Sequence, residues 1–311
     1  MIVTLDKPRP AADKVAITLR DALIIGGNSL KDAGIELPHL DARVLLLAAS
    51  GHDAHTLVRA PETILSPKEF YLYLQMVARR VRREPVAYIT QKKSFWSLDF
   101  DVSCDTLIPR PDSETLIETA LAWMKSRSRP YRIVDVGTGS GCLLLSLLSE
   151  FPLASGIGVD VSEKALEVAA RNARHLGLDQ RSQWKKSFWL DGIEPDVDVL
   201  ISNPPYIPTA EIDTLQDDVA KYEPRLALDG GEDGMNPYRI LAETAASILT
   251  PEGLVIVEIG AEQCADVSRI FSQRGWLQRH VAKDLGGIER CIVFTVQQNE
   301  TTRNHIKGER A

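Results

Sequence analysis

The sequence has little of what marks secreted, metal-binding or membrane-spanning proteins. Its four cysteines are scattered without a Cys-x-x-Cys pair, and its six histidines form no metal-ligand pattern. We therefore expect reduced thiols and no metal site. No apolar run reaches the ~18 residues that a membrane span needs, and Met1–Pro10 lacks the apolar segment of a signal peptide. These absences predict a cytoplasmic protein with no membrane association.

An excess of positive charge is also missing. The 311-residue chain carries a formal net charge of -7 at pH 7. This balance argues against a protein whose main task is to coat nucleic acid, although it leaves room for a local basic patch. The length suits one large domain or two ordinary ones. We find no internal repeat, and the polar residues 298–311 are expected to form a tail.

Residues 1–88 are expected to form a helical domain. One helix is predicted over 38–50, and its inward-facing residues are expected to be Leu40, Val44, Leu47 and Ala48. A second helix begins after Ser66, which has Pro67 at the first helical position and Glu69 in the capping-box position. The apolar stripe of this second helix is expected to be Phe70, Leu74, Val77 and Val81.

The second helix also carries an arginine run, which consists of Arg79, Arg80, Arg82 and Arg83. In most proteins such a run is simply the solvated face of a helix. The functional alternative is a docking surface for an acidic protein or for RNA. The sequence leaves both interpretations open.

Residues 89–111 predict a hairpin or linker, with strand-like alternation over 95–102. From 112 to 297 apolar strands alternate with helices, which predicts the α/β class with a seven-stranded, mainly parallel, Rossmann-like sheet. The expected strands are Arg132–Val136, Ser155–Asp160, Ser182–Lys186, Val197–Ser202, Leu254–Ile259, Leu277–Lys283 and Arg290–Val296.

The stretch Asn203-Pro204-Pro205-Tyr206 follows the fourth of these strands. Prolines cannot continue a strand, so the segment predicts a rigid mouth at the carboxyl end of the sheet. The Asn203 side chain and the Pro204 carbonyl offer hydrogen-bond acceptors, and Tyr206 offers a ring face. Together they suit a planar group that carries an NH2. The simpler interpretation is a proline-rich turn in which asparagine is only a turn former.

A glycine loop, Gly137-Thr138-Gly139-Ser140-Gly141, joins the first strand of this region to a helix. Its glycines allow a tight turn and close approach of a ligand. Cys142 stands where a dinucleotide fingerprint needs its third glycine, and no Gly-Lys-Ser/Thr follows as in a phosphate loop. Asp160 ends the next strand and can accept both hydroxyls of a ribose. Asp160 could instead cap the next helix, but Ser162 is the better cap.

The glycine loop and the acid alone leave many nucleoside cofactors open. The acceptor-rich mouth at Asn203 narrows the choice to S-adenosylmethionine. Three stretches then resemble the amino methyltransferases: Val134–Gly141, Gly158–Ser162 and Asn203–Tyr206. Further stretches are similar to the bacterial peptide-chain release factor N5-glutamine methyltransferases over about residues 15 to 296, namely Pro85–Ile89, Leu107–Pro111 before Glu114, Glu223-Pro224 and Ala227–Gly231 before Asp233-Gly234.

The resemblance implies methyl transfer from S-adenosylmethionine to the side-chain amide nitrogen of the glutamine in the Gly-Gly-Gln motif of class I release factors. It implies that residues 137–141 cradle the methionine part and that Asp160 binds the ribose. It also implies that residues 203–206 hold the glutamine amide and act in catalysis, with Asn203 near the cofactor as well. The family usually has an acid before Trp-Phe near the adenine. Here Ser187 replaces that acid, while Phe188 can still stack on the purine.

Three other readings stay open at this point. The sister family that acts on a ribosomal-protein glutamine is similar, but it typically lacks the second proline seen here at Pro111. An adenine-N6 methyltransferase would grip a flipped base at the same mouth, but it needs a basic channel. A non-catalytic binding module with a vestigial cofactor fold would not need an intact glycine loop. We expect a monomer without direct nucleic-acid binding, whose residues 1–88 recognise the release factor and whose residues 112–297 form the methyltransferase domain.

Overall fold

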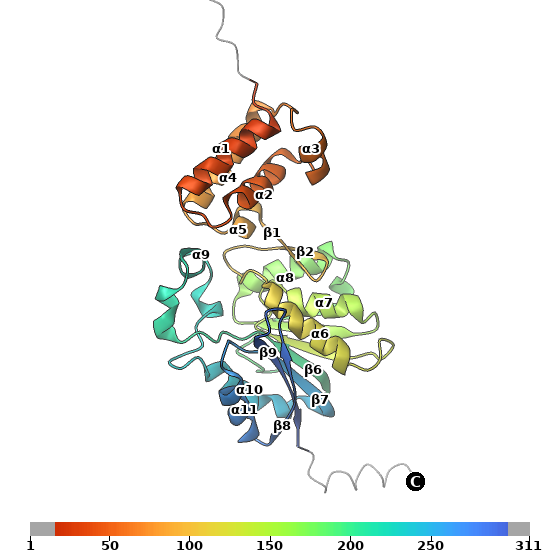
Figure 1. Cartoon of the computed structure of the whole chain (residues 1–311). Helices are drawn as coiled ribbons and strands as arrows, with labels where there is room; N and C mark the ends of the chain where they lie inside the picture. The colour runs from red at the N-terminus through yellow and green to blue at the C-terminus, as the bar shows by residue number, and fades with distance from the viewer. Residues whose placement is uncertain (1–15, 298–311) are drawn as a thin grey trace, which may run out of the picture. The chain divides into compact units, whose positions relative to one another are not determined.

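The computed structural model describes residues 16–297, and the chain divides after Thr90 into two compact units (Figure 1). The expected tail over 298–311 lies outside the described residues. Within 16–297, no helix combines the length and the apolar character that a membrane crossing requires. The first unit has one hydrophobic core, and the second unit has two, one on each face of its sheet.

The described part of the first unit, residues 16–90, contains five helices: α1 (Leu19–Asp32), α2 (Pro38–Ser50), α3 (Ala54–Arg59), α4 (Pro67–Val81) and α5 (Val86–Thr90). The predicted capping box at the start of α4 is confirmed. The backbone N–H of Glu69 donates to Ser66 Oγ at 3.2 Å, and the backbone N–H of Ser66 donates to Glu69 Oε2 at 2.7 Å. The box satisfies two backbone donors that a helix start would otherwise leave open.

The inward face predicted for α2 was wrong in part, and the one predicted for α4 was confirmed for Val77 and Phe70 only. Leu40 and Val44 are 54% and 39% exposed, and the residues of α2 that enter the core are Ala42, Leu45, Leu46 and Ala49. This helix is apolar on several sides, so spacing alone does not select the buried face; packing against α1 and α4 does. In α4 the buried residues are Tyr73 and Val77, while Leu74 and Val81 are exposed.

The arginine run is not simply a solvated face. Arg79 donates to Glu84 at 2.8 Å, and Arg80 donates to Asp41 of α2 at 2.7 Å. Arg83 donates to the carbonyl of Ala33 at 3.0 Å. These three side chains therefore tie α4 to neighbouring segments of the same unit, and the solvated-face interpretation is wrong for them.

The second unit begins with a hairpin, β1 (Lys92–Phe95) and β2 (Leu98–Asp101), whose turn is formed by Trp96 and Ser97. Phe95 and Phe100 are buried in the core of this unit. The seven-stranded sheet consists of β3 (Arg132–Val136), β4 (Ser155–Asp160), β5 (Ser182–Lys186), β6 (Val197–Ser202), β7 (Leu249–Glu258), β8 (Trp276–Lys283) and β9 (Glu289–Val296). β7 starts at Leu249, earlier than the predicted Leu254.

The strand order is β5-β4-β3-β6-β7-β9-β8. β3 to β7 run parallel, and β9 is antiparallel to both β7 and β8. The predicted α/β class with a mainly parallel, Rossmann-like sheet is confirmed. The α-helices of this unit are α6 (Glu114–Trp123), α7 (Cys142–Glu150), α8 (Glu163–His175), α9 (Asp217–Ala220), α10 (Asn236–Thr244) and α11 (Cys264–Ser272).

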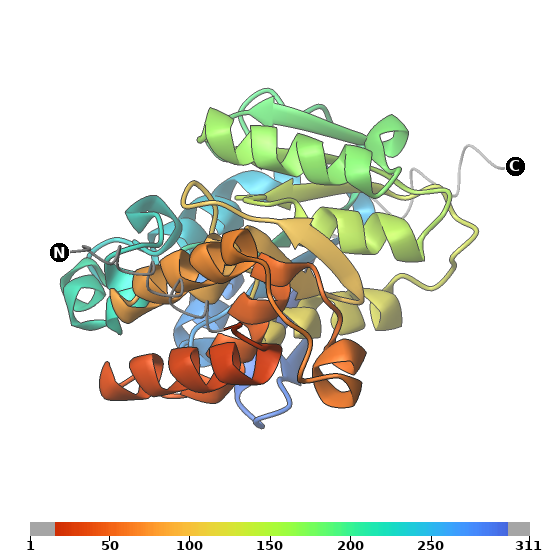
Figure 2. The ribbon, with the colours of Figure 1, turned by 90° about the horizontal axis from the view of Figure 1, so that it is seen from above.

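Helices cover both faces of this sheet (Figures 1 and 2). α6, α7 and α8 contribute to one core with residues such as Ile133 and Ile201 of the strands. α10 and α11 contribute to the other, with residues such as Val134 and Leu200. Side chains of a strand alternate between its faces, so both sides of β3 and β6 are buried. Residues that contact a ligand are therefore expected at the ends of these strands and not along their faces.

Candidate active site

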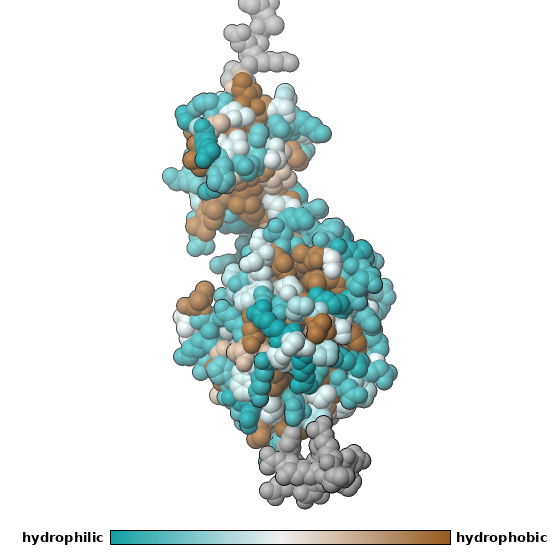
Figure 3. Space-filling model, turned by 90° about the vertical axis from the view of Figure 1, so that its right-hand side faces the viewer, coloured by the Kyte–Doolittle hydropathy of each residue, from teal (hydrophilic) through white to brown (hydrophobic). Residues whose placement is uncertain are grey.

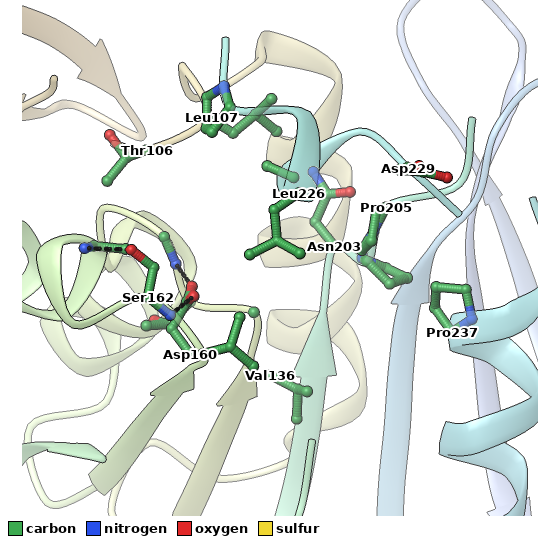
Figure 4. A pocket seen from close by; sticks show the side chains of 18 of the residues that line it. Thr106, Leu107, Val136, Asp160, Ser162, Asn203, Pro205, Leu226, Asp229 and Pro237 are labelled. Carbon is green, nitrogen blue, oxygen red and sulfur yellow. Dashed lines mark hydrogen bonds between the residues drawn. The ribbon is translucent and has the colours of Figure 1, made fainter. Parts of the chain in front are cut away.

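A cavity of about 790 Å³ lies at the carboxyl ends of β3, β4 and β6 (Figure 4). This volume falls in the range of small-molecule sites. β3 has β4 on one side and β6 on the other, and the crevice where strand order reverses is where open α/β sheets bind ligands. All of the residues that line the cavity belong to the second unit.

Most of the predicted site residues meet in this cavity. The lining includes Gly137, Thr138, Gly139, Ser140, Asp160, Phe188, Asn203, Pro204 and Pro205. Gly141 and Tyr206 are not part of the lining. Four segments far apart in sequence are thus brought together because the carboxyl ends of parallel strands share one edge of the sheet.

The glycine loop leaves open space on its cavity side. Gly137 and Gly139 have φ of 71° and 54°, and a Cβ built on either one meets nothing within 4 Å. Gly141 differs, because a Cβ there would lie 2.9 Å from the Trp184 ring; this glycine serves close packing. Thr138 Oγ1 donates to Asp135 at 2.6 Å under the loop, and burial raises the pKa of Asp135 to about 7.

Asp160 ties the end of β4 to the glycine loop. Its Oδ2 accepts the N–H of Gly139 at 3.0 Å, and its Oδ1 accepts the N–H of Ser162 at 2.9 Å (Figure 4). Ser162 caps α8 by accepting the N–H of Ala165 at 3.2 Å, so Asp160 is not needed as the cap. Each carboxylate oxygen keeps a further lone pair for a ligand hydroxyl.

The segment after β5 contributes an exposed ring. Phe188 is 64% exposed and lines the cavity, with the ring of Trp189 edge-on at 6.4 Å between centroids. Ser187, which stands in place of an acid, is buried and donates its hydroxyl to the carbonyl of Asp191 at 2.9 Å. The ring can stack on a flat ligand, while the Ser187 hydroxyl is already used within the chain.

Asn203 lies at the end of β6 beside Pro205 and Leu226 (Figure 4). Its Nδ2 donates to Ser113 Oγ at 3.2 Å, and its Oδ1 accepts no hydrogen bond from any described residue. Because Pro204 has no N–H, its carbonyl adds an acceptor without a competing donor. The mouth therefore offers acceptors to an incoming NH2 group.

Tyr206 is directed away from the cavity lining. Its hydroxyl donates to Glu258 Oε1 at 3.3 Å, and its carbonyl accepts Nε2 of Gln263 at 2.9 Å. Burial raises the pKa of Tyr206 well above its ordinary value and raises that of Glu258 to about 7. The expected ring cover over a flat substrate group gains no support from this placement.

The glycine-rich loop over residues 228–234 packs on the backbone of residues 205–207. Ile207 N donates to the carbonyl of Leu228 at 3.0 Å, and Gly230 N donates to the carbonyl of Ile207 at 2.9 Å. A Cβ on Gly230 would lie 2.9 Å from the Pro205 carbonyl oxygen, a separation that real Cβ atoms avoid. Glycine at 230 thus allows the loop to pack directly on the backbone of the Asn203 motif.

Two further features of the site were not predicted. Ser113 and Glu258 contact the Asn203 motif from distant parts of the chain. An ion pair joins Arg110 to Glu223, whose second oxygen accepts the N–H of Ile108 at 3.2 Å. The one signal available in the sequence for Glu258 is an acid at the end of an otherwise apolar strand.

Comparison with known proteins identifies the family. Residues 21–90 match the model of the PrmC N-terminal domain, and residues 113–231 match that of the methyltransferase small domain. The release factor glutamine methyltransferase of Rhodospirillum rubrum is 42% identical over 282 residues, covering 91% of this chain and 86% of that protein. Its counterpart in Agrobacterium fabrum is 41% identical over 280 residues, covering 89% of this chain and 97% of that protein.

Among solved structures, the release factor-specific protein-(glutamine-N5) methyltransferase of Alicyclobacillus acidocaldarius is 30% identical. The match covers 64% of this chain and 100% of that chain, with a TM-score of 0.39. The identity and coverage of the Rhodospirillum rubrum and Agrobacterium fabrum proteins show that the chain belongs to the release factor glutamine methyltransferases.

Proposed function

We propose that the protein transfers a methyl group from S-adenosylmethionine to the side-chain amide nitrogen (N5) of a glutamine, the one in the Gly-Gly-Gln motif of class I peptide-chain release factors. Membership of the family supports the reaction and the substrate. The assignment of the site is carried by Asn203, whose Nδ2 donates to Ser113 Oγ while its Oδ1, at the cavity, has no hydrogen-bond partner within residues 16–297.

The cavity residues fit the parts of S-adenosylmethionine, which supplies a methyl group on a positively charged sulfur. The open space over Gly137 and Gly139 suits its amino-acid end, where Ser140 Oγ is buried and has no partner among the described residues. The free lone pairs of Asp160 suit the ribose hydroxyls, and the exposed ring of Phe188 suits the adenine.

Asn203 and Pro204 are proposed to prepare the substrate amide. A carboxamide nitrogen is a weak nucleophile because its lone pair is delocalised into the carbonyl. Asn203 Oδ1 and the Pro204 carbonyl would accept its two hydrogens, fix its direction and favour the positive charge that it gains during attack. Orientation of this kind can be worth roughly 7–11 kcal/mol. The proton then leaves to water, so the motif needs no strong base.

The helical unit is proposed to bind the release factor. Of the eighteen exposed large hydrophobic residues in the described chain, eleven lie in this unit, and Figure 3 shows apolar surface on it. Leu37, Leu40 and Val44 form an outward stripe along α2. Exposed apolar residues that gather in this way are typical of protein-binding surfaces. We further propose a monomer that contacts the factor and no nucleic acid.

The experiment incubates the full chain with labelled S-adenosylmethionine and a purified class I release factor, then maps the modified residue by mass spectrometry. The expected product carries one methyl group on the Gly-Gly-Gln glutamine. A factor with that glutamine replaced by alanine is the matched control and should stay unlabelled. Label on a ribosomal-protein glutamine or on adenine, with none on the release factor, would contradict the proposal.

A further inference from the structure

We propose that Asn172 of α8 is a positioning residue of the cofactor site, because it ties the Ser140 carbonyl of the glycine loop to the end of β2. The inference rests on the proposed function, which puts the amino-acid end of S-adenosylmethionine at this loop. Ser140 lines the cavity and Asn172 does not. Asn172 therefore acts on the cofactor through the loop and not by direct contact.

Asn172 is the one polar residue on the buried face of α8. The other buried residues of this helix are all aliphatic, namely Ala165, Leu166, Val168, Ala169 and Ala173. Asn172 is 1% exposed, and a buried amide destabilises the fold unless its hydrogen bonds are made. Asparagine also favours the helix less than alanine or leucine does. An amide at this position therefore needs specific partners.

The partners of the Asn172 amide lie in two different segments. Its Nδ2 donates to the Ser140 carbonyl at 2.9 Å and to the Asp101 carbonyl at 3.0 Å, and its Oδ1 accepts the N–H of Asp101 at 2.7 Å. Both N–H donors of the amide are thus in use. The opposite orientation would set the amide oxygen against two carbonyls and the NH2 against an N–H. The pattern therefore admits one orientation, with an N–H directed at Ser140.

The glycine loop needs bonds of this kind because its backbone rotates easily. Ser140 stands between Gly139 and Gly141, whose φ are 54° and 80°, and glycine has the widest choice of backbone angles. The Gly139 N–H is held by Asp160, and the Gly141 N–H donates to a carbonyl within the loop at 2.8 Å. The bond from Asn172 fixes the carbonyl of the same Ser140–Gly141 peptide group. Two neighbouring elements, β4 and α8, therefore hold the loop in its open shape.

The other end of the connection is also fixed. Asp101 is the last residue of β2, and its carboxylate contacts Arg171 at 3.1 Å and His175 at 3.0 Å, both on α8. Lys92 of β1 pairs with the same carboxylate at 2.5 Å. The amide that holds the Ser140 carbonyl is thus oriented by a backbone group that is itself anchored to the helix and the hairpin.

A loop that already has its binding shape binds a ligand without the free-energy cost of ordering the loop. Without the Asn172 amide, the Ser140 carbonyl loses its donor and the loop can adopt other shapes. Only a fraction of the molecules would then be ready to bind, and the apparent affinity falls by that fraction. The rate at saturating cofactor should not change, because Asn203 and Pro204 are left intact.

The test measures the affinity of the full chain for S-adenosylmethionine by calorimetry in Asn172→Ala and Arg171→Ala. Arg171→Ala is the matched control, because this neighbouring side chain of α8 bonds the same Asp101 and not the glycine loop in the described chain. We expect the dissociation constant to rise on the order of 10-fold in Asn172→Ala, the scale of one net hydrogen bond, and to keep its wild-type value in the control. KM for S-adenosylmethionine should rise in parallel, while kcat and KM for the release factor stay unchanged.

A third variant, Asn172→Asp, separates the bond to the loop from the space that the side chain fills. Aspartate has nearly the size of asparagine and keeps an acceptor for the Asp101 N–H, but it turns an oxygen toward the Ser140 carbonyl. We therefore expect it to bind S-adenosylmethionine no better than Asn172→Ala does. Wild-type affinity in Asn172→Asp would show that the donor is not needed and would overturn the inference.

Hydrogen exchange over residues 137–141, followed by mass spectrometry, tests the inference on the wild type as well. The N–H groups of Gly139 and Gly141 should be protected without cofactor, since their bonds are already made. Free exchange of this loop would overturn the inference, as would an unchanged dissociation constant in Asn172→Ala or an equal rise in Arg171→Ala. A wild-type enzyme that binds S-adenosylmethionine but labels no release factor would instead contradict the proposed function.

Discussion

The Asn203 amide is the side chain on which the proposed reaction depends most directly. Asn203→Ala removes one preorganised acceptor and leaves the Pro204 carbonyl as the other. We expect kcat to fall by on the order of 10²–10³, the scale for one such group, with near-normal affinity for S-adenosylmethionine by calorimetry. Gln180→Ala, which removes an exposed amide outside the cavity lining, serves as the control. Unchanged turnover of the Asn203 variant would remove this residue from the mechanism.

A second prediction at the residue scale concerns stability and pH. The pKa of Glu258 is raised from 4.5 to about 7 by burial, so the folded state binds a proton more tightly than the unfolded state. This stabilisation is present below pH 4.5 and is lost as pH rises through about 7. Glu258→Gln does not titrate. The free energy of unfolding of Glu258→Gln, minus that of wild type, should therefore be larger at pH 8 than at pH 5, by on the order of 3 kcal/mol. The variant is thus the relatively more stable protein at high pH.

Urea unfolding at pH 5, 6, 7 and 8 checks this expectation. Asp135, which has its pKa raised to about 7 as well, should leave the variant with part of the same dependence. A difference between wild type and variant that stays constant across the range would contradict the assigned role of burial at Glu258.

At the scale of elements, the Arg110–Glu223 ion pair joins two segments that both help to form the cavity. Glu223 is 1% exposed at its side chain and Arg110 is 36% exposed. Burial raises the pKa of Glu223 and Arg110 lowers it. Arg110→Ala leaves a buried carboxylate with one fewer partner, so we expect a loss of about 1–3 kcal/mol in the free energy of unfolding.

The matched control for this pair is Lys221→Ala, which breaks an exposed pair with Asp217. Exposed pairs are worth about 0–1 kcal/mol, so little change is expected in urea unfolding. Equal effects of the two variants would show that burial of Glu223 does not decide the outcome. Replacing Glu223 by glutamine along with Arg110→Ala should recover part of the loss, because the buried charge is then removed.

The sequence predicted those features that one segment or one edge of the sheet determines. The strands, the caps of α4 and α8, and the convergence of Gly137, Asp160 and Asn203 all follow from local pattern and parallel topology. The buried face of α2 did not follow, because its apolar residues surround the helix. Nor did the partner of Asn203, since Ser113 lies 90 residues away and its contact depends on packing that no local pattern encodes.

For the whole molecule, one further prediction follows because the two units share no core residues. The core of the first unit uses residues from Leu19 to Ile89, whereas both cores of the second use residues from Phe95 onward. The cavity lining begins at Cys104. A fragment of residues 91–311 should therefore be folded, as measured by circular dichroism, and should bind S-adenosylmethionine with the affinity of the full chain.

The same fragment should no longer methylate the release factor, because the proposed docking surface on the helical unit is missing. Failure to bind the cofactor would mean that the second unit is not self-sufficient, and full activity would mean that the helical unit has another role.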